Sequence, residues 1–150
     1  MSAAAIQRVV PPTSMSAADR ELLIVAEDLL ARVWVDNRHQ VATALRAIDG
    51  RIYTGVHLEG SCRRSSICAE GVALGAARGG LPPESALHVE SIVSVQIKPA
   101  GQFRIIAPCG VCRELISDYS PEARVWLTGE AGIVAMVALD LLPHKTRRLW

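Results

Sequence analysis

Apolar residues recur at helical spacing in the run DRELLIVAEDLLARVW, and we predict a helix over residues 17–34. Ser16, followed three residues later by Asp19, resembles a capping box and marks the start of this helix. Before it, residues 1–15 are mostly small residues, Pro and Ser. We expect these residues to form a flexible N-terminal tail.

Two β-rich segments follow, at residues 40–47 (QVATALRA) and 51–58 (RIYTGVHL). The Asp49-Gly50 pair between them is a strong hairpin signal. Further strands are predicted at residues 88–98, 102–107, 123–129 and 133–139.

A second helix, rich in Ala and Leu, is predicted over residues 68–80, and a third opens at the cysteines of PCGVCRELISDYS. Helices that alternate with strands favour a layered α/β sandwich with a mixed sheet. The chain shows no internal repeat and no low-complexity block, so we expect residues 16–150 to form a single domain.

Composition limits the classes of function. Of the 150 residues, 50% are hydrophobic and 21% charged, which is typical of a globular protein. A net charge of +1 and only 4% aromatic residues argue against nucleic acid or an anionic membrane as a partner and favour a small molecule. No export signal and no apolar run of transmembrane length are visible, so we expect a cytoplasmic protein.

Three of the four cysteines have metal-ligand spacing. Cys109 and Cys112 form a Cys-x-x-Cys at a predicted strand-to-helix junction, and Cys68 begins another predicted helix. Helix N-termini favour the thiolate, which is the form that binds metal. Three protein ligands leave a fourth position open, as in catalytic rather than structural zinc sites, and Zn²⁺ is the cofactor that we expect. A structural zinc or a redox pair is the alternative interpretation.

Glu70 lies two residues after Cys68, where it could move protons to and from a metal-activated water. A non-ligand Glu together with P-C-x-x-C is the general signature of zinc deaminases; here it reads C-A-E at 68–70 and P-C-G-V-C at 108–112.

At these residues the chain resembles the small, three-cysteine, homotetrameric cytidine deaminases and the related blasticidin S deaminases. The resemblance extends from about Val41 to Pro143, through VATAL, DGRIYTGV, CAEGVALGAA, PCGVCRE and DLLP. It implies a three-layer α/β/α sandwich with a mixed five-stranded sheet, and a homotetramer. It also implies the following roles: zinc ligands Cys68, Cys109 and Cys112; proton shuttle Glu70; backbone contacts to the reacting ring near Ala69 and Ala107; and a hydrogen bond from Arg113 to a ligand sulfur, which offsets the charge of three thiolates.

The substrate-reading positions depart from the family. The family's G-x-N-x-E, whose Asn and Glu hold ribose hydroxyls, is here G-V-H-L-E, so Glu59 is retained and His57 replaces the Asn. Ten residues separate His57 from Cys68, which matches cytidine deaminases and not the shorter blasticidin S deaminase loop. His39 stands where the family often has a stacking Phe.

Three other polar residues lie in the loop that precedes Cys68. Arg63 and Arg64 are candidates to bind an anionic group, although exposed loop arginines are usually only solvated. Cys62 is interpreted as a spare thiol.

The function predicted is hydrolytic deamination of a free cytosine nucleoside, in pyrimidine salvage. The first alternative keeps the chemistry and changes the substrate to another aminated heterocycle, such as a nucleoside antibiotic or an aminopurine. An enzyme that edits a polynucleotide is disfavoured by charge and composition, and intact Glu70 argues against a non-catalytic zinc-binding module.

Overall fold

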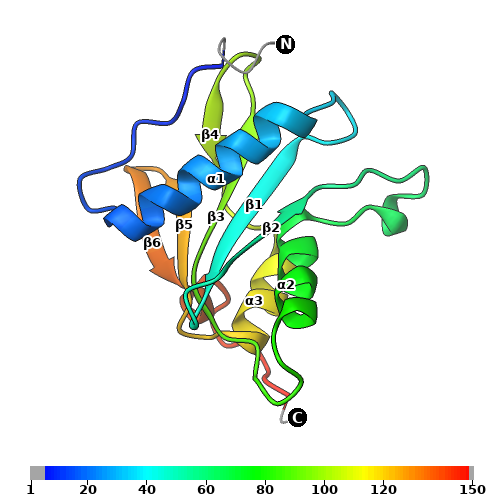
Figure 1. The fold of residues 1–150 in the computed structure, drawn as a ribbon, viewed down its shortest axis with the longest axis vertical. Coiled ribbons are helices and arrows are strands. Elements are labelled where there is room, and N and C mark those ends of the chain that lie inside the picture. The colour runs from blue at the N-terminus through cyan, green and yellow to red at the C-terminus, as the bar shows by residue number, and fades with distance from the viewer. Residues whose placement is uncertain (1–5, 149–150) are drawn as a thin grey trace.

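A computed structural model describes residues 6–148, apart from the side chain of Arg63 (Figure 1). Six strands form one mixed sheet of order β2-β1-β3-β5-β6, and β4 pairs with β3 off this path. The strands are β1 (Val41–Ala47), β2 (Ile52–Val56), β3 (Val89–Ile97), β4 (Phe103–Ile105), β5 (Arg124–Gly129) and β6 (Gly132–Val137). The helices are α1 (Ala17–Val33), α2 (Ala69–Gly80) and α3 (Gly110–Tyr119), with short 3₁₀ turns η2 (Arg63–Ser65) and η3 (Ala138–Leu141).

The helices lie on both faces of the sheet, so the predicted three-layer α/β/α sandwich is confirmed (Figure 1). On one face, α1 packs its apolar side against β1 and β3. On the other face, α2 and α3 cover a second apolar cluster. Each fully buried leucine in these layers stabilises the fold by roughly 2 kcal/mol.

The sheet has six strands rather than the five expected. β3 pairs in parallel with β5 through residues 91–93 and antiparallel with β4 through residues 95–97. The two partners therefore share one edge of β3, and the sheet keeps five positions across its width. Ser94 stands where the partner of β3 changes.

The β1–β2 hairpin is confirmed. The strands pair antiparallel from Ala42↔Val56 to Arg46↔Ile52, and Gly50 turns the chain with a φ of +87°. A positive φ of this kind is easily adopted by glycine, which has no Cβ to clash with the backbone.

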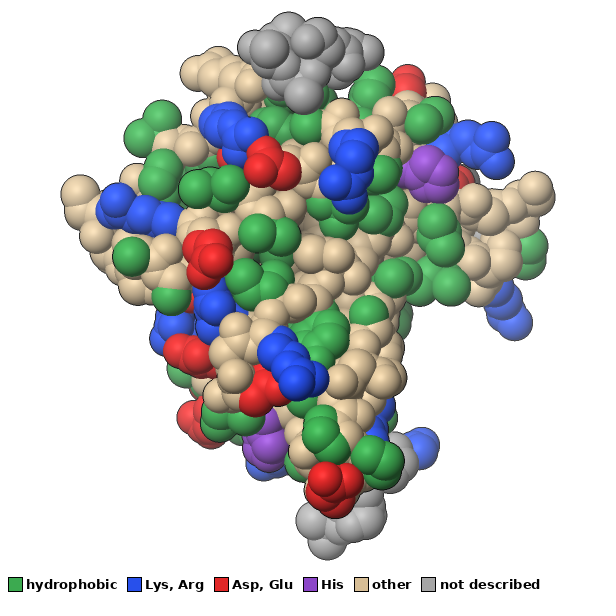
Figure 2. All heavy atoms as spheres, viewed as in Figure 1, with side chains coloured by type: hydrophobic (Ala, Val, Ile, Leu, Met, Phe, Trp, Pro, Cys, Tyr) green, Lys and Arg blue, Asp and Glu red, His purple; other side chains and the backbone are tan. Residues whose placement is uncertain are grey.

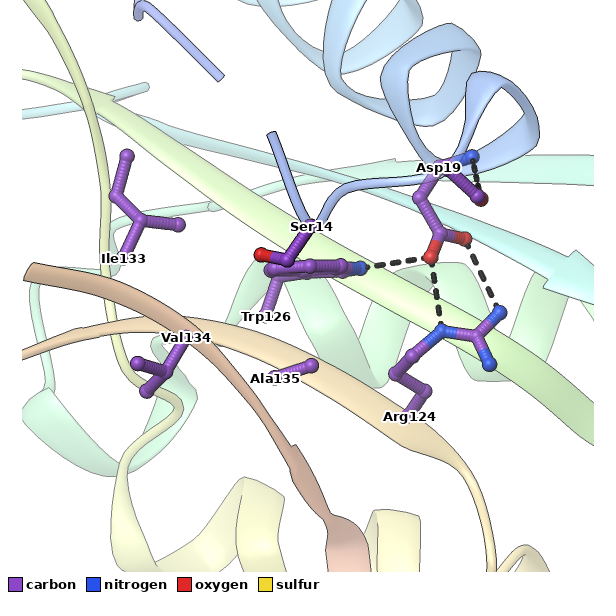
Figure 3. Close-up of a pocket in the computed structure, with 8 residues that line it drawn as sticks. Ser14, Asp19, Arg124, Trp126, Ile133, Val134 and Ala135 are labelled. Carbon is purple, nitrogen blue, oxygen red and sulfur yellow. Dashed lines mark hydrogen bonds and ion pairs between the residues drawn. The ribbon is translucent and has the colours of Figure 1, made fainter. Parts of the chain in front are cut away.

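The N-terminus of α1 is held to the sheet by a buried carboxylate. Ser16 caps the helix by accepting a hydrogen bond from the Asp19 N–H at 3.1 Å. The Asp19 side chain, 2% exposed, turns toward β5, where Arg124 and the indole N–H of Trp126 donate to it at 2.8 and 3.0 Å (Figure 3). Burial raises the pKa of Asp19, but the hydrogen bonds from Arg124 and Trp126 lower it below its ordinary value overall.

The segment expected to form a flexible tail is packed against the fold from residue 6 onward. Ile6 and Met15 are buried, and the backbone of Gln7 bonds to that of Gly101 and Phe103. Glu27, 1% exposed on α1, accepts from the Val9 N–H at 2.8 Å and from Arg8 at 3.0 Å. These contacts tie residues 6–15 to α1; residues 1–5 lie outside the described part of the chain.

On the face that carries α1, Lys and Arg side chains alternate with Asp and Glu, and no continuous basic area forms there (Figure 2). Within residues 6–148, no helix is both long and apolar enough to cross a membrane.

Candidate active site

Two helix N-termini meet at the three predicted cysteines. Cys68 is the N-cap of α2 and Cys109 the N-cap of α3, both with extended backbone and neither forming a side-chain capping bond. Cys112 lies in the first turn of α3 and is 2% exposed. The helix ends expected from the sequence therefore bring the three sulfurs to one place.

The donor set fits a zinc ion. All three sulfurs lie within 4.8 Å of one another, and the Sγ atoms of Cys68 and Cys109 are 3.7 Å apart. A tetrahedral ion with Zn–S bonds of about 2.3 Å separates two sulfurs by about 3.8 Å. Cys62 lies outside this cluster, on an exposed loop.

Burial and repulsion between neighbouring negative charges oppose ionisation of the thiols of Cys68 and Cys112. Burial raises the pKa of Cys68, and burial together with the charge of Glu70 raises that of Cys112. Burial also opposes ionisation of Cys109, but hydrogen bonds from the Cys112 backbone N–H and the Cys68 side chain lower its pKa overall. A bound dication favours all three thiolates, since metal binding and deprotonation are coupled.

Glu70 lies beside the sulfurs, on the first turn of α2. Its side chain is 4% exposed. Oε2 is 3.6 Å from the Cys112 Sγ, and Oε1 accepts a hydrogen bond of 3.1 Å from the hydroxyl of Ser94. The carboxylate is thus held between the sheet and the cysteine cluster.

The close approach of α2 to the sheet depends on Gly55 in β2. A Cβ at this position would lie 2.2 Å from the Ala69 carbonyl oxygen and 2.4 Å from the Ala73 nitrogen, both backbone atoms of α2. Glycine therefore lets the start of α2 rest directly on the hairpin, which fixes the position of Cys68 and Glu70.

A cavity of about 240 Å³ opens in front of Glu70 and the cysteines. Its lining is formed by Gln40, Val41, His57, Cys68, Ala69, Glu70, Gln96, Ile106, Ala107 and Cys109. His57, Ala69 and Ala107, three of the residues predicted to contact the substrate, therefore belong to this lining. The cavity is large enough for one heterocyclic ring system.

Two rows of side chains cross the sheet under this cavity. The inner row, Gly55–Thr43–Ser94, lies beneath Glu70. The outer row continues from His57 through Val41 and Gln96 to Arg104, because Gln96 pairs with Val41 on one side and Arg104 on the other. Directly opposed residues share a face, so both rows point toward α2 and α3.

Glu59 lies beside the cavity rather than in its wall. It lines an adjoining space of about 540 Å³ with Asn37, Gln40 and Ser66. Its Oε2 is 3.4 Å from His57 Nε2, and its Oε1 accepts a hydrogen bond of 2.6 Å from Ser66.

His39 and Arg113 lie elsewhere than expected. His39 is not part of the described cavity wall; its Nδ1 is 3.1 Å from the His57 carbonyl oxygen, to which it donates. Arg113 donates to the carbonyls of Pro108 at 2.9 Å and Leu141 at 3.4 Å, and among the described hydrogen bonds it has none to a cysteine sulfur. Both side chains fix backbone next to the site. The side chain of Arg64 is exposed, and that of Arg63 is outside the described part.

Four polar residues of the site were not predicted from the sequence: Gln40, Thr43, Ser94 and Gln96. Thr43, Ser94 and Gln96 lie within strands in which apolar residues occur on both faces. The signal that could have found Ser94 and Gln96 is their period-two spacing with Ile92, which packs on the same cluster as the site helices.

A second cavity, of about 470 Å³, lies near the N-terminus of α1 and is lined by Asp19, Arg124, Trp126 and three residues of β6 (Figure 3). The carboxylate of Asp19 in this cavity already accepts hydrogen bonds from Arg124 and Trp126. It holds none of the three cysteines, so the cysteine-lined cavity is the candidate active site.

Comparisons with known proteins agree on one kind of chemistry. The chain is 34% identical over 137 residues to blasticidin-S deaminase of Bacillus cereus, covering 90% of this chain and 96% of that one. It is 32% identical over 130 residues to a cytidine deaminase of Halalkalibacterium halodurans, covering 83% and 92%. A crystal structure of cytidine deaminase from Burkholderia pseudomallei superimposes with a TM-score of 0.68 at 27% identity, covering 85% and 98%. No family model matches the chain.

Proposed function

The chain belongs to the family of blasticidin-S and cytidine deaminases, and from this premise we propose that it removes an amino group from a free cytosine nucleoside, with zinc as its cofactor. The observation that supports this most directly is the convergence of three sulfurs and one buried carboxylate at the end of a ring-sized cavity. Cytidine or deoxycytidine would become uridine or deoxyuridine, with release of ammonia.

Cys68, Cys109 and Cys112 would hold the ion through their thiolates. Zinc with three protein ligands lowers the pKa of water to about 7 and so supplies a nucleophile at neutral pH. The three-cysteine cluster supports this assignment by its donor type and spacing.

Glu70 would carry the protons. Water adds to the ring carbon that bears the amino group, its two protons move in turn to the ring nitrogen and to the departing nitrogen, and the C–N bond breaks as C=O forms. Oε2 is the oxygen nearest the cysteine cluster, so it is the atom that would accept and deliver them.

The remaining residues would orient the ring. Ala69, Ala107 and His57 all line the cavity; the backbone groups of the two alanines would contact the reacting ring. Glu59, in the adjoining space, is placed to accept hydrogen bonds from sugar hydroxyls. Arg113 donates a hydrogen bond to the Pro108 carbonyl, and so it would hold in place the backbone that positions Cys109 and Cys112.

A second candidate substrate is a nucleoside antibiotic of the blasticidin S kind. The match to blasticidin-S deaminase over 90% of the chain favours it, and so does His57 at a position where the family usually has Asn. The space beside Glu59 could take a substituent larger than a ribose.

The test is ammonia release by the purified protein from cytidine, deoxycytidine, blasticidin S and aminopurine nucleosides, with zinc measured on the same samples. Glu70→Gln should keep the zinc and lose at least about 1,000-fold in kcat. Glu122→Gln, an exposed Glu on a loop, is the matched control and should retain full activity. Zinc without ammonia release in both wild type and Glu70→Gln would support a non-catalytic zinc module instead.

We also propose a cytoplasmic homotetramer that works in pyrimidine salvage. Apolar side chains on β6, namely Val134, Met136 and Val137, are 38–39% exposed and could be covered by another subunit. Light scattering that shows a monomer would contradict the tetramer.

A further inference from the structure

A chain of buried hydrogen bonds runs from the middle of the sheet to Glu70. The hydroxyls of Thr43 and Ser94 are 2.7 Å apart, and the Ser94 hydroxyl is 3.1 Å from Glu70 Oε1. Thr43 is 0% exposed, and Ser94 and Glu70 are each 4% exposed. Thr43 and Ser94 are cross-strand partners of β1 and β3, so the sheet itself sets their separation.

The direction of these bonds follows from the groups. An ionised carboxylate only accepts hydrogen bonds, so Ser94 donates to Glu70. A serine hydroxyl has one hydrogen, so the bond between the two hydroxyls is donated by Thr43. The order is therefore Thr43 to Ser94 to Glu70, and each donor polarises the next.

The chain of hydrogen bonds makes the two oxygens of Glu70 different. Oε1 is taken by Ser94, whereas Oε2 faces the cysteine cluster at 3.6 Å from Cys112 Sγ. We propose that Thr43 and Ser94 are positioning residues, which hold Glu70 so that Oε2 alone carries protons. This inference rests on the proposed deaminase function.

Packing alone does not account for the two hydroxyls. Their neighbours along the same face of the strands, Leu45 and Ile92, are apolar and fully buried, and a hydrophobic residue of similar size would fill the same space. Ser94 also stands where β3 changes partner from β5 to β4, and its side chain points to the face of the sheet on which Glu70 lies.

The test is a double-mutant cycle of Ser94→Ala and Thr43→Val, with kcat expressed per bound zinc. Ser94→Ala should lower kcat about tenfold or more, with KM within about twofold, because a charge-assisted bond is lost at a group that acts on the transition state. Thr43→Val should lower kcat about threefold in the wild-type background and not at all in the Ser94→Ala background, since Thr43 acts only through Ser94. Thr43→Ser, which keeps the hydroxyl, should restore most of the activity.

Ser91→Ala is the matched control. Ser91 is a fully buried serine on the same strand, on the face opposite to Ser94, and its hydroxyl has no hydrogen-bond partner among the described residues, so its loss should leave kcat unchanged. Additive effects of Thr43→Val and Ser94→Ala on kcat, or an equal loss of kcat in Ser91→Ala, would overturn the proposal.

A second readout separates this inference from the proposed function. In protein labelled with ¹³C at the Glu carboxyls, the Glu70 resonance is identified by its absence in Glu70→Gln. It should shift in Ser94→Ala and in Thr43→Val, with no further shift when Thr43→Val is added to Ser94→Ala. If the wild type deaminates none of the compounds, the proposed function fails, and an unmoved Glu70 resonance would in addition refute the hydrogen-bond chain.

Discussion

Glu70 and His57 line one cavity but differ in how fully their polar atoms are paired. Oε1 of Glu70 accepts a hydrogen bond from Ser94, and Oε2 faces the cysteine cluster. His57 Nδ1 is buried and, among the described residues, has no hydrogen-bond partner, while Nε2 faces Glu59 at 3.4 Å. An unpaired buried nitrogen costs free energy until something bonds to it, so His57 is the residue best placed to select a ligand.

His57→Asn is expected to raise the ratio of kcat/KM on cytidine to that on blasticidin S, by about tenfold or more. The reason is that an amide offers a donor and an acceptor to sugar hydroxyls in less volume than an imidazole. Initial rates measured on cytidine and on blasticidin S give this ratio of kcat/KM values.

His144→Asn is the control for that substitution. His144 is exposed, and its φ of +59° is one that Asn adopts readily. This variant should leave the ratio unchanged. A His57→Asn ratio equal to wild type would show that His57 does not read the substrate.

At the scale of elements, a buried carboxylate links α1 to β5. Asp19 links the first turn of the helix to Arg124 and Trp126 across more than 100 residues of chain. The same carboxylate would have completed a capping box in an isolated helix, so tertiary contacts have taken over a local role.

Asp19→Asn should lower the free energy of unfolding by about 3 kcal/mol at pH 7. The pKa of Asp19 is lowered in the folded state, so its ionised form stabilises the fold above the unfolded-state pKa of about 3.9, and this contribution is lost as pH falls through the folded-state value. The difference between wild type and variant should therefore shrink from about pH 5 to about pH 2.

Urea unfolding across that pH range measures the effect, and Asp140→Asn, at an exposed aspartate on η3, serves as the control. A wild-type–variant difference that stays constant from pH 7 to pH 2 would show that the ionised state of Asp19 does not matter.

The elements were largely predictable, because each carries a local signal. Ser16 marks the start of α1, Asp49-Gly50 the hairpin, and Cys68 and Cys109 the starts of α2 and α3, where the structure has them. The path of residues 6–15 was not predictable, since small residues, Pro and Ser give no periodicity and their contacts with Glu27 and Gly101 are non-local.

The site was predictable only where its residues lie close together along the chain. Cys109 and Cys112, and Cys68 with Glu70, form short motifs. Ser94 and Gln96 reach the same cavity from a strand that is buried on both faces, and a buried strand hides which polar residue points where. The places of His39 and Arg113 depend on backbone carbonyls that no sequence pattern reveals.

At the scale of the whole molecule, the cysteine cluster joins two helices that lie far apart along the chain. Cys68 and Cys109 are 41 residues apart and cap different helices. A bound ion would tie α2 to α3 at their N-termini, so metal affinity and global stability are coupled.

Removal of metal with a chelator should lower the unfolding temperature by about 10 °C or more, because a ligand that binds only the native state stabilises it. Calorimetry with and without chelator measures this shift. Cys109→Ser should show a much smaller shift, whereas Cys62→Ser, also at an exposed cysteine, should behave as wild type. Equal shifts in both variants would exclude Cys109 as a ligand.

The two rows of side chains under the cavity have a consequence for evolution. The inner row and the helix starts hold the reacting groups, and there a single added methyl, as at Gly55, would collide with backbone. The outer row is only partly buried, and exchange of His57 or Gln96 there costs less folding stability than a change in the inner row. Substitutions in the outer row can therefore change which compound such a protein binds during evolution, while the residues that carry out the reaction are kept.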